Sequence, residues 1–424
     1  MVRKKFVFKW WIGVFLVLIL TRVEGQTLYS LEQALSDARS HSSVNQVSGL
    51  MDKEHQLFIS NLNKRWLPQV NLSAQASYQS ETSGIDLSFP GVNIPRLSKD
   101  QYKLQADISQ MIYDGGTNSA LKSLQKDKLD LDQNGIKLEI EGIVENTILT
   151  YFAVLETEIR MRQLDLAIEN LQSVIKKARV AVASGAMLRS ESDQLEAEAI
   201  KLQGTKEEVT SAHQAALDVL GLLTGKSGIN RLGNASILPD STVNQSASFL
   251  AQLDLQKNLM VQNLELEQKN ILPRLAAFAQ TGYGKPGLNF LKNEFAPYYL
   301  VGLKLTWQLS AFYTYHNQQQ LTRYAVEKTD ARKDDVLRKK QMRYQQLLRD
   351  WQPLDKMAPK DEELVSLRQS ILSTSEVQLA NGSITASSYL TRLNDVTEAR
   401  LNKEINQIKM SKNAWLMQLN MGWL

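Results

Sequence analysis

Residues 66–80, WLPQVNLSAQASYQS, decide how this chain is interpreted. From Val70 to Tyr78 every second residue is apolar or small, and the residues between them are polar and uncharged. Alternation with a period of two is typical of a β-strand whose two faces meet different surroundings. Much of the remaining chain has helical patterning, so this strand is expected to lie between long helices.

The opening motif returns once, which makes the strand part of a repeat. Leu67-Pro68-Gln69-Val70 has its counterpart in Leu272-Pro273-Arg274-Leu275, 205 positions further on. Each copy is predicted to contain a helix, two strands joined by a loop, a long helix, a glycine turn and a return helix. We therefore divide the chain into a first repeat over residues 26–224 and a second repeat over residues 225–424.

The predicted elements of the two repeats correspond in order. In the first repeat we expect a helix over 28–65, a strand over 70–78, a strand from 102, a long helix ending near 183 and a return helix over 188–223. In the second we expect a helix over 248–272, a strand from 272, a strand over 298–309, a long helix over 313–379 and a return helix over 385–421. Pro353 and Pro359 are expected to interrupt the last long helix, because proline lacks the N–H that a helix interior needs.

The long helix of the first repeat has a heptad pattern. At 1.5 Å per residue it would be roughly 100 Å long. Its apolar seam predicts a left-handed coiled coil; the seam consists of Ile140, Ile143, Thr147, Thr150, Val154, Thr157, Met161, Leu164, Ile168, Leu171, Ile175, Ala178 and Val182. Ile148, Phe152 and Leu155 lie off this seam, so the helix is expected to have neighbours on two sides.

The N-terminus has the pattern of a secretory signal. Basic residues precede an apolar run from Trp10 to Leu20, and small residues follow, so we expect residues 1–25 to be a signal peptide cleaved after Gly25. An uncleaved anchor is the alternative. The full chain has a net charge of +4, and residues 1–25 hold five positive charges and one negative charge. The mature chain is therefore neutral, which gives no argument for nucleic acid as a partner.

The mature chain offers no helix apolar enough to span a membrane, and it has no cysteine. A disulfide framework and a lipid-bearing N-terminal cysteine are thus excluded, and an exported chain of this size without disulfides suits a bacterial envelope. If the protein meets a membrane, it must do so through its strands.

Two interpretations of the strands compete: they form a half-buried sheet in a soluble protein, or they form part of a membrane β-barrel. The strands are about ten residues long, and tyrosines gather towards their ends, as in membrane strands. The barrel interpretation makes one face of the strands lipid-facing, with Val70, Leu72, Ala74, Tyr78, Leu104 and Ile108 on it. Four strands cannot close a barrel with a lumen, so several protomers would have to share it.

The order of these elements resembles the TolC family of outer-membrane efflux proteins. The likeness rests on the Leu-Pro pair before each strand pair, the corner Ile112-Tyr113-Asp114-Gly115-Gly116, and the turns VASGAML and LANGSIT. It implies a mostly α fold with a β-barrel portion: a homotrimer whose twelve-stranded barrel spans the outer membrane and continues as an α-helical barrel into the periplasm. It also implies that helix 28–65 lies in line with 385–421, and helix 248–272 in line with 188–223.

The same resemblance implies partners and a function. The protein would be the outer-membrane exit duct of a tripartite efflux or type I secretion system, passively conducting drugs, metals or proteins. It would dock with a periplasmic adaptor (membrane fusion) protein and an inner-membrane pump of RND or ABC type. The alternative from another class is an envelope coiled-coil scaffold without a pore.

The glycine turns are the first candidate sites. Gly185 and Gly382 end helices, as glycines commonly do, and the resemblance implies that they form periplasmic tips that dock the adaptor. The family's pattern of glycine followed three residues later by threonine is met by Gly382 and Thr385, whereas Leu188 stands at that place after Gly185. The connector after Thr224 and the Pro353–Pro359 break would form a belt at mid-length.

Glu191 and Asp193 are the second candidate site. The acidic rings that close the family's tip would fall at Ser388 and Thr391 here, so that gate is missing in its usual form. Glu191 and Asp193 are candidates for an acidic pore constriction that favours cations; the alternative is that they are solvated acids in the first turn of a helix.

The sequence contains no recognisable motif for catalysis, metal binding or cofactor binding. The histidines are scattered, and no metal-ligand spacing, nucleophile elbow or phosphate-binding glycine loop occurs. We therefore expect no enzyme activity, no metal and no cofactor.

Overall fold

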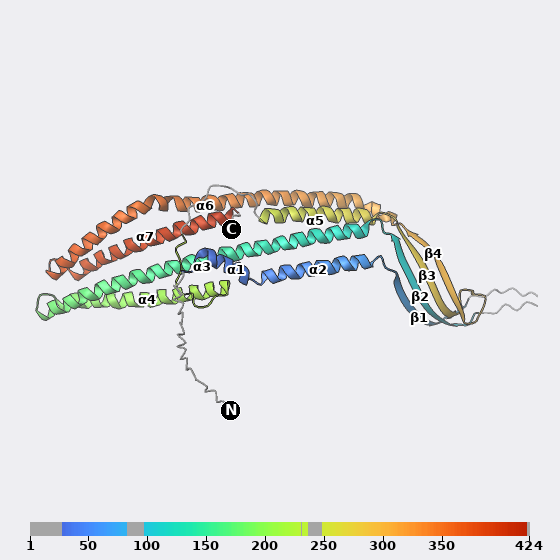
Figure 1. Cartoon of the computed structure of the whole chain (residues 1–424), viewed down its shortest axis with the longest axis horizontal. Helices are drawn as coiled ribbons and strands as arrows, with labels where there is room; N and C mark the ends of the chain where they lie inside the picture. The colour runs from blue at the N-terminus through green and yellow to red at the C-terminus, as the bar shows by residue number, and fades with distance from the viewer. Residues whose placement is uncertain (1–27, 83–96, 230, 236–247, 422–424) are drawn as a thin grey trace, which may run out of the picture.

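The computed structural model describes residues 28–82, 97–229, 231–235 and 248–421. The chain forms a long layer of helices with a four-stranded antiparallel sheet at one end (Figure 1). The predicted signal segment, residues 1–25, lies outside the described residues. None of the described helices has both the length and the hydropathy of a membrane span.

The same order of elements occurs twice along the chain. The first half contains α1 (Leu31–His41), α2 (Val44–Lys64), β1 (Gln69–Tyr78), β2 (Asp100–Tyr113), α3 (Thr117–Ala183) and α4 (Arg189–Thr224). The second half contains α5 (Ser248–Asn270), β3 (Arg274–Lys285), β4 (Ala296–Thr306), the 3-10 turn η1 (Leu309–Ala311), α6 (Phe312–Ala380) and α7 (Ala386–Asn420).

The first predicted helix, 28–65, is in fact two helices. α1 begins at a capping box in which Ser30 and Gln33 exchange side-chain and backbone hydrogen bonds. The break follows His41, where the Ser42 hydroxyl accepts a hydrogen bond from the Val44 amide and the Asn45 side chain donates to the Arg39 carbonyl. Such local side-chain bonds compete with the helical pattern and end α1.

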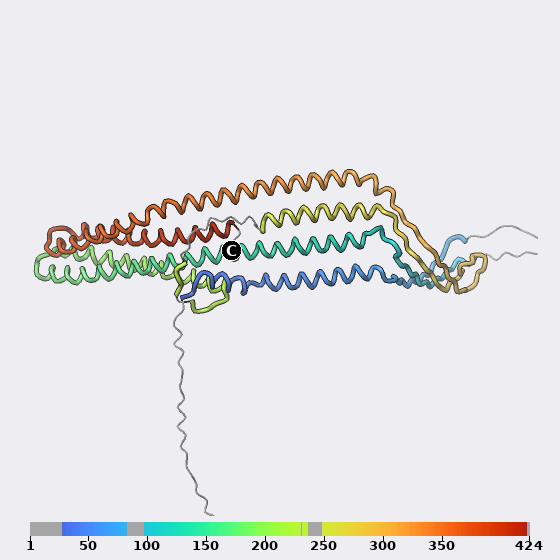
Figure 2. The backbone as a smooth tube through the Cα atoms, turned by 45° about the horizontal axis from the view of Figure 1, so that its top comes forward, coloured from blue at the N-terminus to red at the C-terminus, as the bar shows by residue number. Residues whose placement is uncertain are grey.

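The helices lie in one layer whose order matches the sheet (Figure 2). Next to the sheet the order is α2, α3, α5, α6, parallel to the strand order β1-β2-β3-β4. Towards the far end α4 takes the position beside α3 that α2 holds near the sheet, and α7 lies between α3 and α6 as α5 does. α3 thus has neighbours on both sides, as predicted, and Ile148, Phe152 and Leu155 are buried.

The expected end-to-end pairing of the short helices is therefore wrong. Helix 248–272 was expected in line with 188–223 and helix 28–65 in line with 385–421, yet α5 is in line with α7, and α2 is in line with α4, with α1 beside the C-terminal part of α4 (Figure 1). Each return helix packs against the long helix that precedes it, α4 on α3 and α7 on α6. A Cβ atom at Gly225 would lie 2.4 Å from the His41 ring, so α1 and α4 end side by side.

The expected interruption at Pro353 and Pro359 is also wrong, because α6 continues through both residues. Both prolines are exposed. Water can therefore satisfy the carbonyl groups that lose their N–H donors, while α6 keeps its contacts with α5 and α7.

Two buried clusters hold the layer together. One lies at mid-length and joins α1, α3, α4 and α7 through Leu31, Tyr151, Phe152, Leu220 and Trp415. The other lies towards the glycine turns and joins α3, α4, α6 and α7 through Leu171, Leu195, Leu372, Tyr389 and Leu393.

The described part of the connector after Thr224 packs against the first cluster. The Tyr151 hydroxyl lies 2.7 Å from the carbonyl oxygens of both Tyr29 and Gly233. The Trp415 indole N–H donates to the Ala235 carbonyl over 3.1 Å. The connector is thus fixed to α3 and α7 at mid-length, where the belt was expected.

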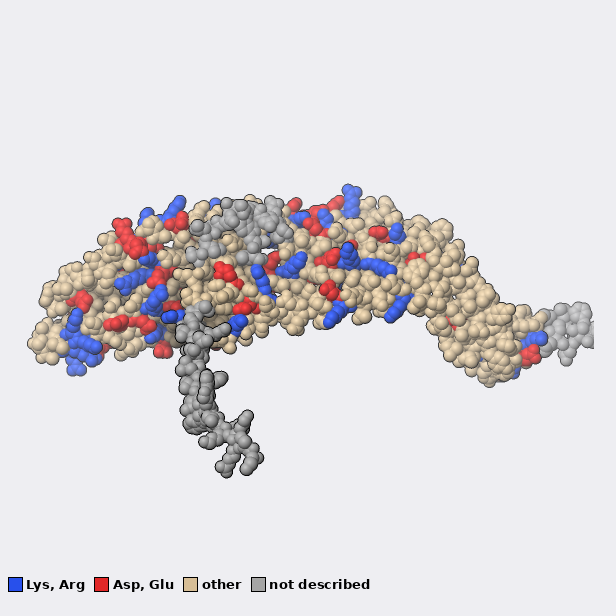
Figure 3. Space-filling model, in the orientation of Figure 1, with Lys and Arg blue, Asp and Glu red and all other residues tan. Residues whose placement is uncertain are grey.

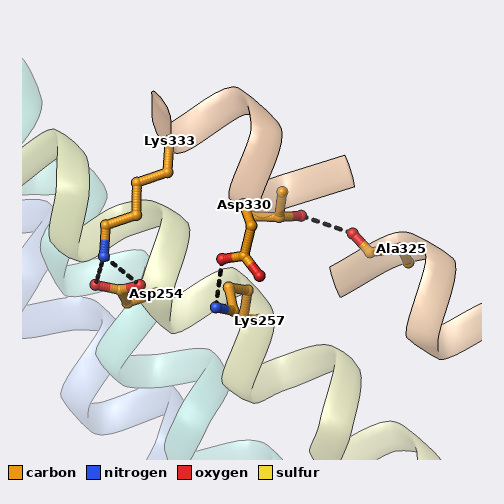
Figure 4. Close-up of polar contacts among 6 residues, drawn as sticks. Asp254, Lys257, Ala325, Asp330 and Lys333 are labelled. Carbon is orange, nitrogen blue, oxygen red and sulfur yellow. Dashed lines mark hydrogen bonds and ion pairs between the residues drawn. The ribbon is translucent and has the colours of Figure 1, made fainter. Parts of the chain in front are cut away.

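Two reciprocal ion pairs join α5 to α6 (Figure 4). The Lys257 ammonium lies 2.5 Å from the Asp330 carboxylate, and the Lys333 ammonium lies 2.7 Å from that of Asp254. Each helix supplies one acid and one base, so a shift of either helix by one turn would separate both pairs.

Candidate functional site

The strand register sorts the sheet into two unlike faces. Val70 lies opposite Ile108, and Ala74 lies opposite Leu104. Directly opposed residues of an antiparallel pair place their side chains on the same face. The residues predicted to face lipid therefore share one face of β1 and β2: Val70, Leu72, Ala74, Tyr78, Leu104 and Ile108.

The register of β3 and β4 continues this apolar face. Ile108 lies opposite Ala279, and Ala279 lies opposite Val301. By the same alternation this face of β3 and β4 comprises Leu275, Ala277, Ala279, Thr281, Tyr283, Pro297, Tyr299, Val301, Leu303 and Leu305, with Lys285 at the far end of β3. The sheet is therefore apolar on one side over its whole width.

This apolar face is not covered by the protein's own helices. Leu72 is 75% exposed, and Leu303 and Leu305 are each 67% exposed. A soluble monomer rarely leaves so large a contiguous apolar surface in water. The face requires an apolar partner, either lipid or protein.

Charged side chains are concentrated on the helices. Figure 3 shows Lys, Arg, Asp and Glu spread along the helical layer, whereas the visible surface of the sheet is almost free of them except at its far end. At that end Asp100 and Lys285 lie 3.4 Å apart and form an ion pair.

The opposite face of the sheet is polar and hydrogen-bonded. The Asp107 carboxylate accepts hydrogen bonds from the side-chain amides of Gln105, at 2.5 Å, and Gln280, at 2.8 Å. The Tyr298 hydroxyl donates to the side-chain amide oxygen (Oε1) of Gln105 over 2.9 Å. Three strands thus contribute to one network built around a carboxylate, a group that is costly to place in hydrocarbon.

Two aromatic rings on this polar face lie over glycines of the adjacent strand. A Cβ atom at Gly282 would lie 2.6 Å from both the Tyr298 ring and the Leu104 carbonyl oxygen, and one at Gly302 would lie 2.9 Å from the Phe278 ring. Neither glycine has a left-handed backbone, so the close approach of atoms on the adjacent strands explains each glycine.

Both outer strands of the sheet have a free edge. β1 pairs only with β2, and β4 pairs only with β3, among the described residues. An unpaired edge offers a row of backbone donors and acceptors, which hydrocarbon does not tolerate.

The glycine turns lie together at the end of the molecule opposite the sheet (Figure 1). Gly185 and Gly382 have φ angles of 76° and 68° and occupy equivalent places in two Schellman motifs. In the first, the Ala186 amide donates to the Ala181 carbonyl; in the second, the Ser383 amide donates to the Gln378 carbonyl. Leu188, after the first turn, is 71% exposed.

The helices after the two turns begin differently. The Thr385 hydroxyl accepts a hydrogen bond from the Ser388 amide and caps α7. Leu188 gives α4 no side-chain cap. The Glu191 carboxylate, in the first turn of α4, accepts a hydrogen bond from the Ala386 amide at the start of α7. Glu191 therefore joins the tips of the two helical hairpins.

Asp193 has a different environment from Glu191. Its side chain is 65% exposed, and its carboxylate lies 4.0 Å from the Arg189 guanidinium of the preceding turn. The structure thus separates the two acids, which the sequence placed together.

Sequence reasoning did not identify the contact between Glu191 and Ala386 or the network around Asp107. The first joins residues 195 positions apart, and the second joins residues 173 positions apart. A strand pattern could place Asp107 and Gln280 on polar faces, but their contact depends on the pairing of β2 with β3, which no single strand encodes.

The sequence matches no protein-family model and no curated protein. The structure, however, superposes on outer-membrane channels. The CmeC outer membrane channel of Campylobacter jejuni is 12% identical with a TM-score of 0.71, over 93% of this chain and 85% of that chain. The Vibrio cholerae outer membrane protein VceC is 15% identical with a TM-score of 0.65, over 92% and 94%.

The open state of the MtrE outer membrane channel of Neisseria gonorrhoeae gives the same result, with 12% identity and a TM-score of 0.67 over 92% of this chain and 88% of that chain. The chain therefore has the fold of TolC-type channels, and the predicted fold, mostly α with a small antiparallel sheet, is confirmed.

Proposed function

We propose that this protein is an outer-membrane duct that extends into the periplasm and passively conducts exported solutes. The observation that carries this proposal is the two-faced sheet, with an exposed apolar face on one side and a hydrogen-bonded polar face on the other. Lipid accounts for the first face and a water-filled lumen for the second. The likeness to outer-membrane channels supports the same conclusion.

The duct would be a homotrimer. The free edges of β1 and β4 must be paired in lipid, and three four-stranded sheets joined edge to edge would close a barrel of twelve strands. The helical layer supports this assembly, because both of its outer helices expose large apolar side chains: Leu57 and Phe58 on α2, and Leu321 and Tyr324 on α6.

The tips would dock a periplasmic adaptor (membrane fusion) protein, which would connect the duct to an inner-membrane pump of RND or ABC type. The docking surface would include Gly185, Leu188, Gly382 and Thr385. Exposed Leu188 is an apolar contact available to a partner, and both glycines have open space around them.

The pore constriction is a further part of the proposal. Glu191 and Asp193 would narrow the tip and, repeated three times, would favour cations at that end. Asp193 offers a solvated carboxylate for this role, while Glu191 is bonded to the start of α7.

Cell fractionation with heat-modifiable gel mobility tests the duct against a pore-less coiled-coil scaffold. The duct should be recovered in the outer membrane as an oligomer whose mobility in detergent gels changes on heating. A scaffold has no need of an apolar sheet face. Recovery as a soluble periplasmic monomer would contradict the duct.

A further inference from the structure

Charged residues in the strands are unevenly divided between the two faces of the sheet. The four strands contain six charged residues, two of which, Asp100 and Lys285, form the ion pair at the far end on the apolar side. The register places the other four on the polar face: Lys103, Asp107, Arg274 and Lys304. The polar face therefore has three cations and one carboxylate.

The single carboxylate of this face does not neutralise the cations. Asp107 is half-buried, and both of its observed side-chain partners, Gln105 and Gln280, are neutral amides. Within the described part of the chain no carboxylate lies within 4.0 Å of Lys103, Arg274 or Lys304. The polar face keeps a net positive charge.

The three cations have neutral surroundings. The Lys103 ammonium lies 5.8 Å from the centre of the Tyr298 ring, and the Arg274 guanidinium donates to the Asn270 side chain over 2.9 Å. Lys304 is exposed. Their charge is thus available to solutes rather than compensated within the chain.

Arg274 and Lys304 lie close together where the sheet joins the helices. Arg274 is the first residue of β3, after α5, and it lies opposite Thr306, two positions from Lys304 on the neighbouring strand. Both side chains share the polar face. A solute that leaves the helical section would pass this pair first.

We propose that the polar face of the sheet makes the barrel section of the duct select for anionic solutes, with Arg274 and Lys304 as the main determinants. The inference rests on the proposed duct, in which three copies would place these residues in a ring. Like charges in a narrow lumen with low-dielectric walls add, so the local concentration of anions rises and that of cations falls.

Reversal potentials of the full-length protein in planar bilayers under a potassium chloride gradient test this inference. In Arg274→Gln/Lys304→Gln the permeability ratio of chloride to potassium should fall at least about twofold. Lys285→Gln is the matched control, because this lysine lies on the other face at the strand end; its ratio should stay at the wild-type value.

An unchanged ratio in a conducting Arg274→Gln/Lys304→Gln channel, or an equal fall in Lys285→Gln, would overturn the inference and leave the duct intact. If the double variant does not assemble, Lys304→Gln alone decides the question, because this exposed lysine has no described ionic partner to lose. Glu191→Ala removes the contact between the two hairpin tips, so it serves as a second channel in case the tip of the wild-type protein blocks conduction. Absence of any conductance from both proteins would contradict the duct itself.

Discussion

The contact between Glu191 and Ala386 is a helix cap supplied by another helix. The first N–H groups of α7 have no partners within the helix, and a carboxylate at a helix N-terminus is favourable. Thr385 satisfies the Ser388 amide and Glu191 satisfies the Ala386 amide. The start of α7 is therefore stabilised by residues from both halves of the chain.

Glu191→Ala should loosen the tip, because it removes the acceptor of the Ala386 amide. Loss of a helix cap costs about 0.5–2 kcal/mol, so hydrogen exchange at Ala386 should be about 2- to 30-fold faster. Asp193→Ala is the matched control, since it lies two residues away and has no described contact with α7. Equal acceleration in both variants would show that the contact is not specific.

If both acids line the pore, Glu191→Ala and Asp193→Ala should each also weaken the cation preference of the channel.

Tyr151 fixes the connector at mid-length through its hydroxyl. Tyr151→Phe keeps the ring but leaves the Tyr29 and Gly233 carbonyls without this donor. Loss of a buried hydrogen bond costs about 1–3 kcal/mol. The urea midpoint of unfolding, followed by the helical circular dichroism signal, should therefore fall. Tyr315→Phe, the same change in the first turn of α6, is the control and should leave the midpoint unchanged. No change in Tyr151→Phe would contradict a structural role of the hydroxyl.

Buried Tyr151 and half-buried Tyr29 also make the stability of the fold depend on pH. Burial raises the pKa of Tyr151, and burial, followed by the nearby Asp37 carboxylate, raises the pKa of Tyr29 to about 12. Since the folded state favours the neutral phenols, this stabilisation is complete below the unfolded pKa of about 10. It falls as the pH rises above 10 and through the folded values. Alkaline titration of the helical signal should show unfolding there, with a weaker dependence in Tyr151→Phe.

At the scale of elements, the ion pairs between α5 and α6 should set the register of the two helices. Asp254→Lys places a cation beside Lys333 and should lower the urea midpoint. Asp254→Lys/Lys333→Asp restores opposite charges and should recover most of the loss, and high salt should reduce the difference. Failure of the double variant to recover stability would show that each charge acts alone.

The elements also show what the sequence predicts well. Period-two alternation in residues 70–78 and the glycines at 185 and 382 are local signals, and the strand and both turns occur where expected. Pro353 and Pro359 are local signals that packing overrides, because exposed sites on a helix held by two neighbours tolerate the lost hydrogen bonds. The alignment of α5 with α7 depends on which side of α3 each return helix takes, and no local pattern encodes that choice.

The candidate sites likewise divide into features set by local sequence and features set by packing. The two-faced character of β1 was predictable, because side chains alternate between the two faces along a strand. The bond from Glu191 to Ala386 was not, because it depends on how two hairpins meet.

At the scale of the whole molecule, the helical layer and the sheet belong to one assembly. The strand order β1-β2-β3-β4 continues into the helix order α2, α3, α5, α6, so both sections have their free edges on the same two sides. In the proposed trimer, a neighbouring copy that paired with an outer strand would therefore also cover an outer helix. The same proposed contact would cover the exposed apolar residues on α2 and α6 and pair the open strand edges.

Two adjacent residues of β1 test which medium surrounds this assembly. Leu72 lies on the apolar face and Ser73 on the polar face, at neighbouring positions near the middle of the strand. A basic residue on the lipid face near the bilayer midplane costs about 2–4 kcal/mol, whereas one in the lumen remains hydrated. Leu72→Arg should therefore reduce the heat-modifiable oligomer in the outer membrane severalfold.

Ser73→Arg should assemble normally and change only ion conduction, by adding a positive charge to the lumen. In a soluble sheet both positions are exposed to water, and both arginines would be tolerated alike. Equal recovery of the two variants would thus show that the apolar face does not meet lipid, whatever the likeness of the fold to outer-membrane channels.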